Sequence, residues 1–356
     1  MLKLEESIGV QKNLSELCSD RDLETNEIFI GNSYYGFDKI IKLYSGLPLS
    51  YQLKAVLPHG VYLDHNYMWE AEKSAKLPAI LCYPPYRESI YRKETNKKII
   101  LSASPFTYLV EMMKSQSSLR RQGTIFFPYH STHHINVHMD YERLAKELCK
   151  LGDEFNPITV CIYWKDFNLG AHIPFLNSGM KVVSAGHIYD NEFLFRFFHL
   201  CSLHRYAAGN GLGSHIFYSV KSGCSYFHFD LVDYELGADE DTIERDAGIV
   251  PPIRENELKK FFQYPNKEST IDQLKVVDYY LGMDFFKSRN ELYRELQQVE
   301  KMDKVSFFTY YRGSYPKLFL PTWCMRMIIQ FRLNLLQLSR DFRKIILNIF
   351  CSDKIY

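Results

Sequence analysis

Histidine, hydroxyl and glycine residues are concentrated in four short loops between residues 123 and 235, each directly after an apolar, strand-like run. Imidazoles, hydroxyls and the backbone of glycine loops are groups that bind phosphate and move protons. The runs alternate with helix-like segments, which predicts a parallel sheet whose ligands bind at the carboxyl ends of its strands. The sequence therefore predicts a phosphorylated ligand bound by Tyr129, His130, Ser131, Thr132, Trp164, Lys165, Gly186, His187, Asn210, Gly211, Gly213, Ser214 and His215.

The fourth loop, AGNGLGSH, carries the clearest anion signal. Its glycines let the backbone approach a ligand, and Ser214 is placed to cap the helix that follows. The N-terminus of a helix presents free N–H groups and a positive dipole end to an anion. The spacing matches neither a dinucleotide fingerprint nor a P-loop, so a turn that merely caps a helix stays open as an alternative.

The other loops admit two interpretations each. Lys165 could neutralise a phosphate beside a stacking Trp164, or it could form a solvated ion pair with Asp166. A single His187 at a strand end is as compatible with a packed polar residue as with a ligand contact. His134 and His138 are four residues apart, but no acidic ligand is near in sequence, and we expect no metal site.

A further histidine lies well upstream, in the segment PHGVYLDH. His59 follows a strand-like run, Gly60 lets the chain turn, and Asp64 comes shortly after. If this strand end faces the phosphate site, His59 or Asp64 is placed to act as a general base. A purely structural turn histidine is the alternative.

The elements that would position these loops fall into four segments. We expect a lead-in at residues 1–30, a Rossmann-like acceptor domain at 31–115, a Rossmann-like nucleotide-donor domain at 116–240 and a helical region at 241–356. The polar stretch Ser115–Gly123 is expected to link the two domains. The predicted strands are Leu53–Leu57, Ala79–Cys82, Lys98–Ser102, Thr124–Phe127, Ile158–Tyr163, Lys181–Ser184, Tyr206–Ala208 and Ser225–Phe229. One predicted helix starts at Ser104–Pro105. The others include Tyr141–Leu151, Asn168–Asn177, Asn191–Leu203 and Ser214–Ser222.

Composition excludes several classes of protein. The chain has 356 residues, of which 46% are hydrophobic, so disorder throughout is excluded. A net charge of +1 argues against nucleic-acid binding, which needs a basic face. The eight cysteines form no CxxC pair and favour a reducing, cytoplasmic setting. We expect neither a signal peptide nor a spanning helix.

These motifs together resemble the bacterial surface-polysaccharide glycosyltransferases of the GT-B type, including proteins of capsule and O-antigen clusters. Residues 50–240 look most like CMP-sugar transferases and CDP-polyol phosphotransferases. Gly213-Ser214-His215 is similar to their phosphate-binding helix start, and His59-Gly60 is similar to the His-Gly motif of the polyol-phosphate enzymes. Tyr163-Trp164-Lys165 stands where a His-Pro pair is typical, and the acidic motif of bacterial sialyltransferases is absent.

The resemblance implies an α/β fold of two facing domains and a metal-independent displacement. It implies a nucleotide-activated sugar donor, with a CMP-sugar favoured, no cofactor, and a surface-polysaccharide or lipid-linked glycan as acceptor. Three alternatives stay open: a CDP-polyol phosphotransferase, a non-catalytic assembly protein, and a nucleotide-sugar epimerase, which would turn over without an acceptor.

The C-terminal segment Trp323–Phe350 predicts a basic amphipathic helix. Five Lys and Arg residues interrupt an otherwise apolar stretch, opposed only by Asp341. Such a helix can lie in the interface of the inner membrane, which would suit a lipid-linked acceptor. A helix packed across both domains is the alternative.

Overall fold

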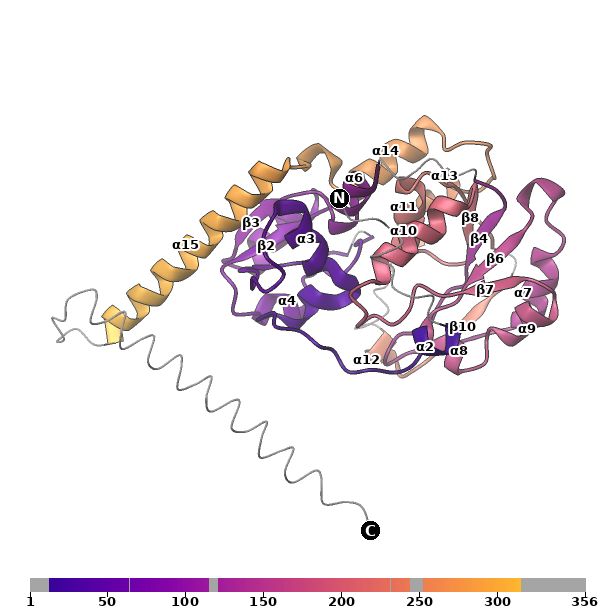
Figure 1. The fold of residues 1–356 in the computed structure, drawn as a ribbon, viewed down its shortest axis with the longest axis horizontal. Coiled ribbons are helices and arrows are strands. Elements are labelled where there is room, and N and C mark those ends of the chain that lie inside the picture. The colour runs from indigo at the N-terminus through magenta and orange to yellow at the C-terminus, as the bar shows by residue number, and fades with distance from the viewer. Residues whose placement is uncertain (1–12, 64, 115–120, 231, 244–251, 315–356) are drawn as a thin grey trace, which may run out of the picture. The chain divides into compact units, whose positions relative to one another are not determined.

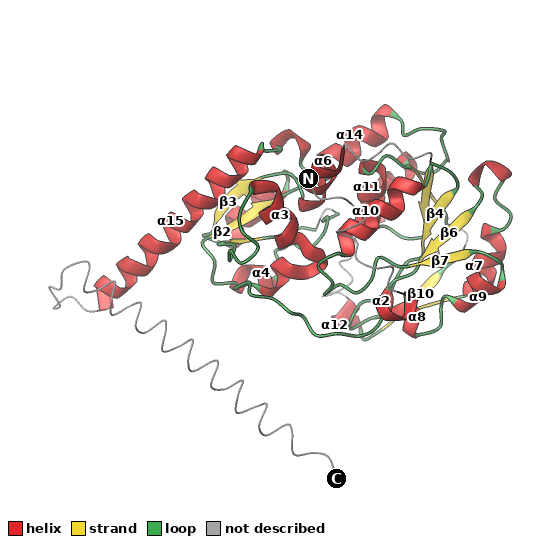
Figure 2. Ribbon diagram, in the orientation of Figure 1, coloured by secondary structure: helices red, strands yellow, loops and turns green. Residues whose placement is uncertain are grey.

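The computed structural model describes residues 13–63, 65–114, 121–230, 232–243 and 252–314. The chain forms two compact units, Met1–Asp303 and Lys304–Tyr356, and the architecture below belongs to the first. Figure 1 labels its elements and Figure 2 shows its helices and strands.

The first sheet has three parallel strands in the order β1-β2-β3. These are β1 (Ala55–Val56), β2 (Ala79–Cys82) and β3 (Lys98–Leu101), accompanied by α3 (Phe37–Ser45), α4 (Glu70–Ser74), α5 (Arg87–Glu94) and α6 (Pro105–Met113). Helix α6 begins as predicted, because the Ser104 side chain accepts a hydrogen bond from the Thr107 N–H and Pro105 occupies the first turn.

The second sheet has five parallel strands in the order β7-β6-β4-β8-β9. Its strands are β4 (Thr124–Phe127), β6 (Ile158–Cys161), β7 (Lys181–Val183), β8 (Tyr206–Gly209) and β9 (Ser225–His228), with η3 (Asp153–Phe155), α7 (Tyr141–Leu148), α8 (Trp164–Asn168), α9 (Ile173–Asn177), α10 (Phe193–Leu203) and α11 (Ser214–Lys221). β5 (Asn136–Met139), which lies between β4 and β6 in the chain, forms an antiparallel ribbon with β10 (Tyr234–Gly237), which follows β9. The predicted α/β class with parallel sheets is confirmed. The loops after β4, β6 and β8, which are adjacent strands, share one edge.

An apolar core joins the two sheets. The Phe106 ring of α6 stacks on Tyr218 of α11 with centroids 4.3 Å apart, and it meets Phe197 of α10 edge-on at 5.9 Å. All three side chains are buried. Because such contacts bury large rings from both halves, they hold the edges of the two sheets in a fixed relation.

The described part of the predicted lead-in is packed against both sheets. The Asn168 side chain donates to the Cys18 carbonyl at 2.9 Å, on the side of the second sheet. Glu27 accepts from the backbone N–H of Leu53 at 3.1 Å, just before β1. This segment, with α2 (Leu14–Leu17) and η1 (Ile30–Gly36), therefore connects the two halves.

Two local predictions were wrong. The helix expected over Asn168–Asn177 is instead α8 and α9, because Gly170 between them adopts a φ of +82°, which ends a right-handed helix. Ser214 does not cap α11: Gly213 holds the N-cap position, and Ser214 is the first helical residue.

The described chain after β10 is helical, as expected. It contains α12 (Glu240–Ile243), α13 (Pro252–Phe261), α14 (Ile271–Tyr280), η5 (Met283–Phe285) and α15 (Arg289–Ser314). No helix within the described ranges has the length and apolarity needed to cross a membrane. The predicted helix Trp323–Phe350 and most of the predicted linker Ser115–Gly123 lie outside the described residues. The predicted domain boundaries stay predictions.

Candidate functional site

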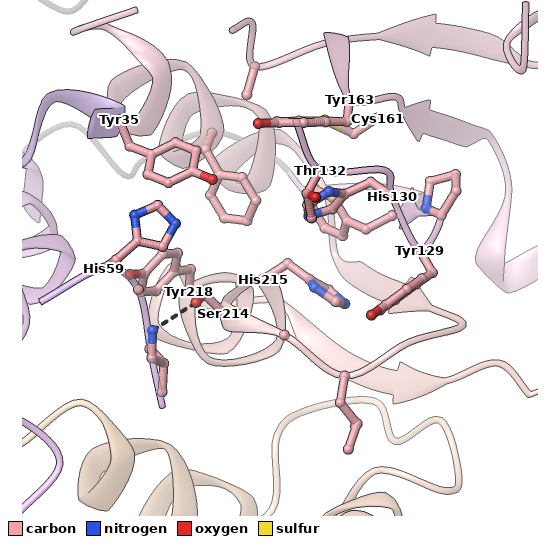
Figure 3. A pocket seen from close by; sticks show the side chains of 18 of the residues that line it. Tyr35, His59, Tyr129, His130, Thr132, Cys161, Tyr163, Ser214, His215 and Tyr218 are labelled. Carbon is pink, nitrogen blue, oxygen red and sulfur yellow. Dashed lines mark hydrogen bonds between the residues drawn. The ribbon is translucent and has the colours of Figure 1, made fainter. Parts of the chain in front are cut away.

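A pocket of about 530 Å³ lies between the carboxyl edges of the two sheets. The turn after β1 contributes His59 and Gly60, and the second sheet contributes the loop after β4 and the start of α11. Seven of the predicted site residues line it: His59, Tyr129, His130, Thr132, Gly213, Ser214 and His215. In Figure 3, Tyr35 and His59 face His130, Thr132 and Tyr163 across the pocket, with Ser214 and His215 between them. The two sheets thus supply one site.

Ser214 ties the two edges of the pocket together. Its hydroxyl accepts a hydrogen bond from the backbone N–H of Val61 at 2.9 Å. A Cβ on Gly60 would lie 2.9 Å from the same oxygen, and Gly60 has a φ of +76°. Glycine is needed at this position because any side chain would combine backbone strain with a contact against Ser214.

His59 is set in an aromatic surround. Its ring centroid is 5.4 Å from that of Tyr35 and 5.6 Å from that of Tyr34, and its backbone N–H donates to the buried Glu72 carboxylate at 3.3 Å. Burial, together with a smaller effect of the nearby His133, lowers the pKa of His59 to about 4. The imidazole is therefore neutral at pH 7 and has a lone pair that can accept a proton.

His215 is the corresponding imidazole on the second sheet. Its Nε2 lies 3.3 Å from the Tyr226 hydroxyl, and its ring is 5.5 Å from that of Phe127. Burial lowers the pKa of His215 to about 3, with His130 and His228 adding to the effect. His215 is therefore also neutral at pH 7.

Ser131 and Asp166 support the loop after β4 from behind. The backbone N–H and the hydroxyl of Ser131 both donate to the Asp166 carboxylate, at 3.0 and 2.6 Å. The same hydroxyl accepts a hydrogen bond from the Val137 N–H at 2.9 Å. Burial raises the pKa of Asp166, and the bonds from Ser131 oppose that shift. Ser131 is thus fully buried structural support and lies outside the pocket.

We expect Asp166→Ala to destabilise the protein by roughly 1–3 kcal/mol, because it leaves the Ser131 N–H buried without its acceptor. Urea unfolding measures the change. The matched control is Asp22→Ala, at an exposed aspartate, which is expected to stay within about 0.5 kcal/mol of the wild type. Equal losses in the two variants would contradict the supporting role of Asp166.

Lys165 and Trp164 also lie outside the pocket lining. The Lys165 ammonium donates to the carbonyls of Thr132 and His133, at 2.6 and 3.0 Å. The buried Trp164 ring packs on His187 with centroids 4.1 Å apart. The Trp164 ring also packs on His133 of the loop after β4, with centroids 5.4 Å apart, so both side chains contact this loop. In this geometry Lys165 forms neither a phosphate contact nor an ion pair with Asp166.

The remaining predicted residues act through Tyr129 or lie away from the pocket. Asn210 accepts from the backbone N–H of Tyr129 at 2.8 Å, and a Cβ on Gly211 would lie 2.0 Å from the Tyr129 ring. These two residues therefore fix Tyr129, which does line the pocket. Gly186 and the fully buried His187 are outside the lining, and Asp64 lies outside the described residues.

Sequence reasoning missed several aromatic lining residues. Tyr35 has a φ of +58°, a strained conformation for a non-glycine residue, and both its side chain and that of Tyr163 line the pocket. Tyr234 stacks on Tyr129 with centroids 4.1 Å apart, and Tyr218 lines the pocket from α11. The position of Tyr163 at the end of the predicted strand Ile158–Tyr163 was the one available signal.

The electrostatics of the lining are unusual for a phosphate site. No Lys or Arg is among the described residues that line the pocket, and the acidic one is Glu255, paired with Lys259 at 2.9 Å. Among the described residues, no cluster of three or more His, Cys, Asp or Glu side chains is arranged to hold a metal ion. The groups in the pocket that can bind an anion are hydrogen-bond donors, imidazoles and a helix N-terminus.

Comparisons with known proteins give little further information. No protein-family model and no curated protein matches the chain. Among solved structures, the chain is similar to a variant of the wall teichoic acid polymerase TagF, with 13% identity and a TM-score of 0.32. The match covers 67% of this chain and 60% of that one.

Proposed function

We propose that the chain is a transferase that moves a group from a nucleotide-activated donor to a hydroxyl of a surface-polysaccharide or lipid-linked glycan acceptor. The observation that carries the proposal is the pocket in which a neutral His59 faces the first turn of α11. A base on one side and an anion-binding helix start on the other are the two parts that such a displacement needs.

The roles follow from the positions. The phosphate of the donor binds at Gly213, Ser214 and His215, where the first N–H groups of α11 lack intrahelical partners. The stacked rings of Tyr129 and Tyr234 offer an aromatic platform to the base or sugar. The acceptor hydroxyl binds beside His59.

Within this class, the placement of His59-Gly60 supports a CDP-polyol donor over a CMP-sugar. This pair is the motif that resembles the polyol-phosphate enzymes, and it lies in the pocket, whereas the position typical of the His-Pro pair holds Tyr163-Trp164. The acceptor oxygen would bond to the phosphorus of the polyol phosphate, and the bond from that phosphorus to the bridging oxygen would break. CMP would leave with the electron pair, and His59 would retain the acceptor proton.

We expect nucleotides to raise the thermal stability of the protein selectively. CMP, CDP, UDP and GDP are each added at saturating concentration, and the unfolding midpoint is measured. A ligand at 100 times its Kd adds about 2.7 kcal/mol of stability, provided it binds only the folded state. Stabilisation by CMP or CDP, but not by UDP or GDP, supports a cytidine-activated donor. Because CMP is the leaving nucleotide of both candidate reactions, a phosphate found in the product on the acceptor, rather than a bare glycoside, identifies the polyol-phosphate donor. No shift with any of the four would reject a nucleotide donor and favour the non-catalytic alternative.

The place of action remains part of the proposal. An acceptor carried on a lipid would bring the protein to the inner face of the cytoplasmic membrane, with the segment Trp323–Phe350 as the contact. Deletion of residues 323–356 is then expected to lower binding to liposomes of anionic lipid.

A further inference from the structure

The described lining of the pocket supplies no permanent cation for a phosphate. The nearby Lys and Arg side chains are already paired. Lys165 is bound to two carbonyls, Lys259 to Glu255 and Asp230, and Arg196 to Asp190. The lining does contain four imidazoles: His59, His65, His130 and His215.

A buried phosphate ester needs more than a helix N-terminus. The first turn of α11 provides an effective charge of roughly half a unit, and burying an uncompensated full charge is costly. His130 and His215 are the imidazoles on the phosphate side of the pocket, one in the loop after β4 and the other in the first turn of α11. A proton on either of them would supply the missing charge.

The geometry of both rings leaves room for that proton. The Nδ1 atom of His130 lies 2.8 Å from the Ser131 carbonyl, which only accepts, so Nδ1 carries the hydrogen and Nε2 is the basic atom. The Nε2 atom of His215 lies 3.3 Å from the Tyr226 hydroxyl, which can either donate or accept and so suits both the neutral and the protonated ring. The imidazole of His130 is close enough to that of His215 to lower its pKa.

The charged and titratable groups around this pair are few. From β9, His228 and Tyr226 face His215, and from the loops His130 faces it. The rings of Tyr129 and Tyr163 flank His130, with centroids 6.4 and 4.4 Å away. The carboxylate of Asp166 lies behind the loop, near His130. On α13, Glu255 is neutralised by Lys259.

We propose that His130 and His215 act as the counter-cation of a phosphate-ester ligand by taking up a proton when it binds. The inference rests on the proposed function and specifies the ligand chemistry of the same pocket: an anionic phosphate ester whose binding is coupled to pH. His59 is not part of this pair and stays neutral to accept the proton of the acceptor.

The sign of the coupling is fixed. Burial holds the pKa of His215 at about 3 in the empty pocket, and an anion beside the ring raises it. At a pH between the pKa values of this imidazole in the free protein and in the complex, the complex holds a proton that the free protein lacks. Affinity therefore falls as pH rises through this window, by up to about tenfold per pH unit for one proton, and becomes constant above the bound-state pKa.

Calorimetric titration of the full chain with CDP-glycerol tests the proposal. The diphosphate of this probe is esterified at both ends and keeps only strongly acidic hydroxyls, so it does not titrate between pH 5.5 and 8.5 and adds no slope of its own. Titrations at pH 7 in buffers of different ionisation enthalpy count the protons exchanged, and we expect uptake of about one. Titrations across the pH range give the slope of the affinity.

His130→Asn and His215→Asn are expected to reduce the proton uptake and flatten the slope. His130 is exposed, so its variant remains informative if the His215 variant fails to fold. His138→Asn, at an exposed histidine of β5 outside the pocket lining, should bind CDP-glycerol as the wild type does. Binding with no proton uptake, or with proton release, would overturn the inference and leave the proposed function standing. No binding at any pH would overturn both.

Discussion

His59→Asn is expected to abolish transfer while sparing nucleotide binding. A positioned general base contributes roughly 10²- to 10⁴-fold to a rate, and asparagine lacks a group that accepts the proton. The donor phosphate is bound by α11, on the other side of the pocket, so the stabilisation by nucleotide should persist. Initial rates of labelled donor transfer and thermal shifts measured on the same preparation separate the two effects.

The control for this experiment is His138→Asn, which removes an exposed imidazole outside the pocket. A second readout is the pH profile of kcat/KM. Because burial lowers the pKa of the free His59 to about 4, kcat/KM should fall as pH drops through that value, and above it the titration of His59 should add no further pH dependence. Full activity in His59→Asn would contradict the base assignment and support a non-catalytic role.

Gly36→Ala is expected to cause the largest loss of stability among single glycine replacements near the site. Gly36 has a φ of +80°, and a Cβ there would lie 2.2 Å from the backbone carbonyl oxygen of Asn191. The left-handed conformation alone costs alanine roughly 1–2 kcal/mol. The clash with backbone adds about 1–3 kcal/mol, because it forces the two segments apart.

Gly46→Ala is the matched control for that prediction. Gly46 has a φ of +78°, but a Cβ there would meet nothing within 4 Å, so it isolates the backbone term. Urea unfolding measures the loss of unfolding free energy in both variants. The loss in Gly36→Ala minus that in Gly46→Ala is the cost of the contact between the added Cβ and Asn191. Equal losses would mean that η1 does not pack against the segment before α10. We also expect weaker nucleotide binding in Gly36→Ala, because Tyr35, the next residue, lines the pocket.

The parallel sheets and the placement of the key loops were predictable from the sequence. Apolar runs such as Ala79–Cys82 and Thr124–Phe127 coincide with β2 and β4, because each is a short buried run followed by a polar loop. Strand-end position predicted that the loops after β4, β6 and β8 share one edge, whereas His59 follows a strand of the other sheet and its place in the same site was a conditional expectation. The physical reason is that the carboxyl ends of parallel strands meet at one edge.

The roles within the loops were not predictable. Ser131 reads as a phosphate contact, yet its partner is Asp166, 35 residues later, and no local pattern indicates that bond. Lys165 reads as a phosphate cation, but it is bound to carbonyls of the neighbouring loop. Both cases depend on contacts between adjacent strands, which only the three-dimensional arrangement supplies.

The N-terminal segment illustrates the same limit. Residues 1–30 read as a charged lead-in because they lack periodicity, yet the described part is anchored by Glu27 and Cys18 to opposite sheets. Tyr35, with its left-handed backbone, lies a few residues after this segment, which runs between the two sheets. Irregular segments that pack through individual hydrogen bonds leave no periodic signal.

The central claim is that a nucleotide binds at the first turn of α11, within the pocket between the sheets. Hydrogen–deuterium exchange with and without saturating CDP tests it directly, because bound phosphate protects the amide groups that it contacts. We predict slower exchange in peptides covering residues 127–134 and 209–218, and unchanged exchange in α7, which lies outside the pocket lining. Unchanged exchange in the two pocket peptides, with CDP present at a concentration that stabilises the protein, would contradict this account.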